Sequence, residues 1–135
     1  MMVLSHSMIG AGIGYQLDQP VVAFLLMSLF HLVMDKVPHF WPKSKKWGKL
    51  FALSDIASCG LLLLFILVYQ PEHYVSVFAG AFGGILVDVI FVGIPSVRRS
   101  KYGQWQHNRQ PHLSNPAYLL TDLMAIILGL IIWYI

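Results

Sequence analysis

The segment PVVAFLLMSLFHLVMDKVPHF, residues 20–40, decides how the rest of the chain is interpreted. It begins as an apolar run and closes with His31, Asp35 and His39, each four residues after the last. Residues at this spacing lie on one face of an α-helix, so we expect a ladder of about 12 Å, at about 1.5 Å per residue. Imidazole, carboxylate and imidazole form a ligand set for zinc or a related divalent cation. Because ionisable groups inside an apolar span are costly, the ladder marks a functional site.

The composition is that of an integral membrane protein. Of the 135 residues, 57% are hydrophobic and 11% are charged, and the mean hydropathy is +0.67. Soluble domains carry about 25% charged residues. The length allows one domain, residues 1–135, built from a few helices. The single cysteine, Cys59, rules out an intrachain disulfide and a zinc site made of thiolates.

Five apolar segments are candidates to cross a bilayer. The predicted fold is therefore all-α, an integral membrane bundle of about five transmembrane helices, the first of them short. At about 24 Å, the first segment falls below a hydrocarbon core of about 30 Å, so we expect it to pack on its neighbours. The expected spans are residues 2–17, 20–37, 50–70, 74–94 and 117–135.

The basic residues give this bundle an orientation. All nine lysines and arginines fall within residues 36–49 and 98–109, and the connections at residues 18–19 and 70–73 have none. By the positive-inside rule both basic regions are cytoplasmic, which places the N-terminus inside and the C-terminus outside. The expected localisation is therefore the inner (plasma) membrane of the cell, as a multi-pass protein with a cytoplasmic N-terminus.

Ionisable side chains gather at one depth of the predicted bundle. Four of the six acidic residues lie within spans, each nearer to the cytoplasmic end of its helix. Any single aspartate could instead cap a helix or pair with a lysine, but so many such groups at one depth favour a bound dication. A free aspartate would then serve as general base. The predicted metal ligands are His6, His31, Asp35, His39, Asp88, Asp122, His107 and His112, and the predicted catalytic residues are Asp55 and Asp88.

The type of ligand favours zinc, because nitrogen and oxygen donors occur without thiolate; manganese and iron are the alternatives. The number of ligands suggests two metals, or carboxylates that orient the histidines. A proton- or ion-conducting polar core and a purely structural network are the other interpretations of the same residues.

Glycines spaced four apart mark helix faces that permit close approach. In the first and fourth spans these faces also carry an ionisable residue, so the polar groups are expected to point into the bundle. The same faces would allow oligomers. They consist of His6, Gly10 and Gly14 in the first span, and of Gly80, Gly84 and Asp88 in the fourth.

The opening SHSMIGAGIG, residues 5–14, followed by HLVMDKVPHF, residues 31–40, resembles small bacterial membrane proteins described as membrane-bound metal-dependent hydrolases. The resemblance covers most of the chain and rests on His6 before a glycine-rich helix, and on the H-x3-D-x2-P-H segment that ends at His39. A shorter likeness is to the zinc-ligand segment of zinc-dependent phospholipase C, which has a longer spacing to its final histidine. The resemblance implies a hydrolase and supplies no substrate.

The expected function is a membrane-embedded metal-dependent hydrolase, with its site at the cytoplasmic leaflet and a lipid phosphoester as substrate. The sequence has no serine or cysteine in an activating context and no glycine-rich phosphate loop. The alternative is a non-enzymatic protein that carries metal or protons, or an assembly subunit that uses the metal structurally. No convincing internal repeat, a common feature of transporters, is present. The expected partners are the lipid bilayer and a lipid-phosphate substrate, and no nucleic acid.

Overall fold

Five helices of fifteen or more residues make up most of the protein. The computed structural model describes residues 3–69, 72–101, 104–105, 112–113 and 115–135. The predicted all-helical class is confirmed, apart from two strands of two residues each that pair in parallel. The elements are α1 (Val3–Leu17), α2 (Pro20–Met34), β1 (His39–Phe40), α3 (Lys45–Tyr69), α4 (Tyr74–Gly93), α5 (Pro95–Arg99), β2 (His112–Leu113), η1 (Pro116–Tyr118) and α7 (Leu119–Tyr134).

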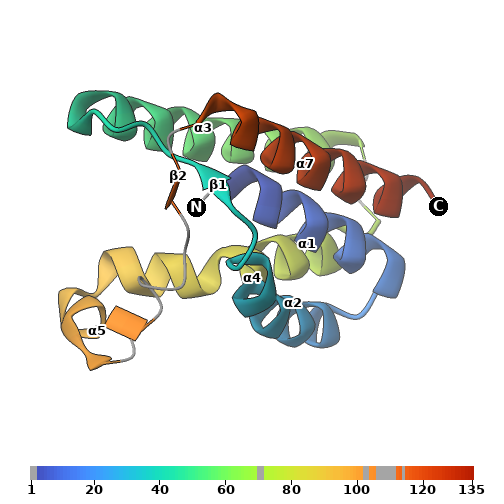
Figure 1. Ribbon diagram of the computed structural model, residues 1–135. Coiled ribbons are helices and arrows are strands. Elements are labelled where there is room, and N and C mark those ends of the chain that lie inside the picture. The colour runs from blue at the N-terminus through green and yellow to red at the C-terminus, as the bar shows by residue number, and fades with distance from the viewer. Residues whose placement is uncertain (1–2, 70–71, 102–103, 106–111, 114) are drawn as a thin grey trace.

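Helix α1 is the centre of the bundle. It contacts α2, α3, α4 and α7, and it runs between α7 on one side and α4 on the other (Figure 1). Every residue from Ser5 to Gly12 is buried. Because serine, alanine and glycine recur in this helix, neighbouring helices approach it on several sides. The short first helix therefore packs on its neighbours, as the sequence predicted.

Glycines bring α1 and α4 into backbone contact. A Cβ atom at Gly10 would overlap the carbonyl oxygen of Gly80, and a Cβ atom at Gly14 would overlap the carbonyl oxygen of Ser76. Only a residue without a Cβ fits at such points. The glycine faces thus serve packing within one chain. Contacts between copies of the chain through these faces stay a prediction.

Helix α2 ends earlier than predicted. Its C-cap is Asp35, whereas the sequence suggested that the span continues to residue 37. Pro38 has no amide hydrogen, and its ring disfavours helical geometry in the residue before it, so the helix does not continue. His39 lies instead in β1, paired with His112 of β2. The prediction that His39 shares one helix face with His31 and Asp35 is therefore wrong.

Two helices among the described residues are long and apolar enough to cross a membrane. They are α3 and the segment Pro116–Tyr134, which contains η1 and α7. Helix α2 and the Tyr74–Ile90 part of α4 are apolar but shorter. Helix α1 has fifteen residues, which give a length of about 22 Å. The structure thus shows an all-helical protein with two helices of spanning length, where the sequence predicted about five.

Candidate metal centre

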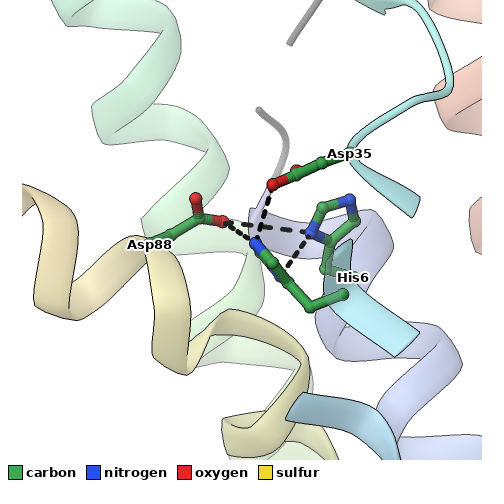
Figure 2. Close-up of side chains that lie close together, drawn as sticks. His6, Asp35 and Asp88 are labelled. Carbon is green, nitrogen blue, oxygen red and sulfur yellow. Dashed lines mark hydrogen bonds and ion pairs between the residues drawn. The ribbon is translucent and has the colours of Figure 1, made fainter. Parts of the chain in front are cut away.

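Two histidines and two aspartates meet at one end of the bundle. His6 comes from α1, His31 from α2, Asp35 from the C-cap of α2, and Asp88 from α4. One ligand atom of each lies within 4.8 Å of the others, and all four residues are buried. Figure 2 shows the side chains of His6, Asp35 and Asp88 directed toward one another. The sequence predicted that these four residues lie close together, and the structure confirms it. Their role as metal ligands stays a prediction.

The helix directions explain why these residues meet. His6 lies near the start of α1, whereas His31 and Asp88 lie near the ends of α2 and α4. Antiparallel neighbours bring the start of one helix beside the end of the next. His31 and Asp35 are separated by four residues, which puts them on the same side of the last turn of α2. The close contact of α1 with α4 then brings His6 to Asp88.

Three of the distances in this cluster are close to those around a single metal ion. The Nε2 atom of His31 lies 3.0 Å from Oδ2 of Asp35 and 3.6 Å from Oδ2 of Asp88. The Nδ1 atom of His6 lies 3.9 Å from the same oxygen of Asp88. Ligand atoms that are each about 2.0–2.1 Å from a tetrahedral ion are about 3.4 Å apart. The residues present therefore fit a divalent cation held between them.

A backbone contact fixes which nitrogen of His31 carries the proton. Its Nδ1 atom lies 2.6 Å from the carbonyl oxygen of Gly84. A carbonyl only accepts, so Nδ1 donates, and in the neutral ring Nε2 carries a lone pair. That lone pair faces the carboxylates of Asp35 and Asp88, an arrangement that needs a cation, either a second proton or a metal. Metal-bound histidines commonly donate their other N–H group to a carbonyl in this way.

Gly84 is the site residue whose role sequence reasoning missed. The sequence marked it as a packing glycine, and the structure adds the hydrogen bond that its carbonyl accepts from His31. A Cβ atom at this position would lie 2.6 Å from the carbonyl oxygen of His6. The spacing of Gly80, Gly84 and Asp88 on one helix face was the only signal in the sequence.

His39 and Asp122 form a pair beside this cluster. Nδ1 of His39 lies 2.9 Å from Oδ1 of Asp122, and the backbone N–H of Phe40 donates to Oδ2 of the same residue at 3.3 Å. The rings of His39 and His6 have centroids 5.4 Å apart. Nε2 of His39 is buried and has no hydrogen-bond partner among the described residues. Asp122, predicted as a ligand, is thus engaged with His39 and its neighbour, because α7 packs against β1.

Asp55 of α3 lies at the start of α1. Its carboxylate accepts hydrogen bonds from the backbone N–H groups of Val3 and Leu4, at 2.6 Å and 3.1 Å. These amides begin α1, where a helix has unpaired donors and a partial positive charge. Asp55 therefore caps α1 from the neighbouring helix α3, and it is not one of the four clustered residues. The catalytic role of Asp55 stays a prediction.

The two histidines of the long loop are placed only in part. His107 lies outside the described residues. The main chain of His112 pairs with that of His39 in the β1–β2 ladder, which brings this part of the loop beside the cluster. This pairing of two short segments, far apart in the chain, had no signal in the sequence.

No protein family model, curated protein or solved structure matches this chain. The resemblance to membrane-bound metal-dependent hydrolases is therefore an expectation from the sequence.

Proposed function

We propose that this protein is a membrane-embedded, metal-dependent hydrolase. The observation that carries the proposal is the position of Nε2 of His31, which lies 3.0 Å and 3.6 Å from two buried carboxylates while Nδ1 donates to a backbone carbonyl. A lone pair and two negative charges in a buried site repel one another unless a cation lies between them. His6, His31, Asp35 and Asp88 would hold that cation. The donors favour zinc, with manganese or iron as alternatives.

The surface of the helices supports placing the protein in a membrane. In α3 the buried residues form one stripe, Gly48, Asp55, Cys59 and Ile66. Leucines on the other sides of the helix are exposed, among them Leu61. Exposed leucines on several sides of one helix are typical of a protein that contacts lipid or a partner there. We infer that all five long helices cross or enter the inner (plasma) membrane, with α1 sheltered at their centre.

A bound metal would polarise a phosphoryl oxygen and lower the pKa of a bound water molecule. His39 is suited to accept the proton of that water, because Asp122 holds Nδ1 and leaves Nε2 open. With the metal bound, the water oxygen would bond to phosphorus while the bond from phosphorus to the leaving oxygen breaks. His39 would pass the proton to that oxygen, which would leave as an alcohol. Asp122 acts here as a positioning residue.

Metal analysis of purified variants tests the proposal. His31→Ala and Asp35→Ala should each abolish stoichiometric metal, because each removes a ligand. His73→Ala should retain the metal, since His73 pairs with Asp18 at 3.0 Å, away from the four clustered residues. A panel of phosphoester lipids, assayed with and without chelator, should show hydrolysis only with metal. Equal metal content in the wild type and in Asp35→Ala would contradict the proposal.

A structural metal in a non-enzymatic carrier or assembly subunit is the second candidate. The near-complete burial of the cluster favours it, since Asp88, the most exposed of the four residues, is only 4% exposed. In that case chelation should lower the thermal stability and no lipid of the panel should be hydrolysed. For an enzyme, chelation should stop turnover without unfolding the bundle.

The proposed orientation has its own test. In a Cys59→Ser background, single cysteines at Gln19 and at Glu72 should react with a reagent that cannot cross the membrane when it is added from outside. Both positions are exposed and lie in connections without basic residues. Reaction from the cytoplasmic side alone would refute a cytoplasmic N-terminus.

A further inference from the structure

An apolar groove lies between α2 and α7 and reaches the candidate metal centre. Its volume is about 480 Å³, within the range of about 300–1,000 Å³ that is typical of ligand sites. Residues of α1 form its floor. The walls include Phe30 and Val33 of α2, and Leu128 and Ile131 of α7.

The polar groups of this groove are all at one end. They are Ser5, His6, His39 and Thr121, and every other lining residue is apolar. Along α7 the lining extends from Thr121 to Ile131, a rise of about 15 Å. That length is about half of a hydrocarbon core of about 30 Å, which is the depth of one leaflet. A ligand that matches the groove therefore has a polar group at one end and a hydrocarbon chain as long as one leaflet is deep.

The groove opens on the side of the molecule rather than at an end. Val33 is 52% exposed and Leu128 is 49% exposed, although both line the groove. These side chains continue the apolar surface that the proposed membrane placement turns toward lipid. A chain already in the bilayer would enter sideways, without passing through water. None of the described residues that line the groove is acidic, so an anionic headgroup meets no like charge from them.

We propose that this groove binds an acyl chain of the substrate, and that the substrate is a phospholipid whose phosphate lies at His39 and the metal centre. The inference rests on the proposed function and names its substrate class. The fit of groove length to one leaflet and the placement of His6 and His39 at the polar end carry it. Hydrolysis at phosphorus, as written above, would then release the part of the lipid esterified to the phosphate.

Two variants obstruct the groove without touching the cluster. Ala125→Phe fills it, since Ala125 is a half-buried lining residue of α7. Val33→Trp narrows the mouth at an exposed position, so it keeps the test decisive if Ala125→Phe fails to fold. The matched control is Ala57→Phe on α3, where Ala57 is exposed and not part of the groove.

Photolabelling in lipid nanodiscs tests the proposal. The protein is loaded with zinc and exposed to phosphatidic acid carrying a diazirine in its acyl chain, or to diacylglycerol with the same chain. Labelled peptides are quantified by mass spectrometry. We expect phosphatidic acid to label the groove residues of α2 and α7 more strongly than diacylglycerol does. In Ala125→Phe and Val33→Trp this labelling should fall about tenfold, equivalent to about 1.4 kcal/mol, while the exposed leucines of α3 and the Ala57→Phe control stay unchanged.

Two outcomes would overturn the inference. Equal labelling by the two probes would mean that the groove holds bulk lipid without regard to phosphate. Labelling that both groove variants leave unchanged would mean that the chain binds elsewhere. Metal content is measured on the same samples, so wild-type protein that binds zinc but shows no preferential labelling of the groove refutes only the groove. A protein that binds no zinc refutes the proposed function itself.

Discussion

The close contact of α1 with α4 predicts that a single methyl group removes His6 from the candidate metal centre. In Gly10→Ala, the new Cβ atom would lie 2.7 Å from the carbonyl carbon of Gly80, whereas ordinary contacts begin at 3.4 Å. The carbonyl oxygen of Gly80 lies closer still, so the helices must separate by at least about 0.7 Å, the difference between these two values. His6 lies one turn before Gly10 and moves with α1. The distance from Nδ1 of His6 to Oδ2 of Asp88, now 3.9 Å, would grow to at least about 4.6 Å.

That increase exceeds what one metal ion can bridge. Two ligand atoms with bonds of about 2.0–2.1 Å are at most about 4.2 Å apart. Gly10→Ala should therefore lose the contribution of one ligand. Zinc binding in small structural sites is worth about 10–16 kcal/mol, so one of four ligands accounts for about 2.5–4 kcal/mol, or roughly 70- to 1,000-fold in Kd. Overpacking should also lower the free energy of unfolding by about 1–3 kcal/mol.

The assay is zinc affinity by chelator competition, together with thermal unfolding in the same detergent. The control is Gly60→Ala, because nothing lies within 4 Å of a Cβ atom at that exposed glycine of α3. Gly60→Ala should keep the wild-type Kd and should not lower stability, since alanine is the better helix former. Wild-type zinc affinity in Gly10→Ala would refute the argument that helix contact sets the geometry of the site.

Three further predictions concern residues around the bundle. Asp122→Asn should keep stoichiometric metal yet slow lipid hydrolysis about 10²- to 10⁴-fold, the usual contribution of a positioned acid or base such as His39; unchanged turnover would exclude the pair from catalysis. Asp55→Ala should lower the free energy of unfolding by about 0.5–2 kcal/mol through loss of the α1 cap, without loss of metal, and an unchanged melting temperature would contradict the capping role. The hydrogen bond with His73 lowers the pKa of Asp18 below its usual value of 3.8, so the folded state favours the carboxylate. This stabilisation is present above that value and disappears as the pH falls through the lowered pKa; thermal melts at pH 7 and pH 3 should show that Asp18→Asn is less stable than wild type at pH 7 and that the difference is smaller at pH 3.

The sequence alone determined the helices and most of the cluster. Apolar runs, prolines and i,i+4 spacings are local properties, so they predicted the helical class, the pairing of His31 with Asp35, and the faces shared by His6, Asp88 and the glycines. The alternating direction of the predicted spans followed from the positions of the basic residues, and it put those residues at one end of the bundle.

Only the tertiary structure decided what each remaining ionisable group does. Asp55 and Asp122 look alike in the sequence, since each is an aspartate near the start of an apolar helix. In the structure one meets the amides of α1 and the other meets His39. Pro38 predicted where the second span ends. The position of His39 after this proline, however, depends on the pairing of β1 with the distant strand β2. Such roles depend on which donors come within hydrogen-bond distance in space, and no local pattern encodes that.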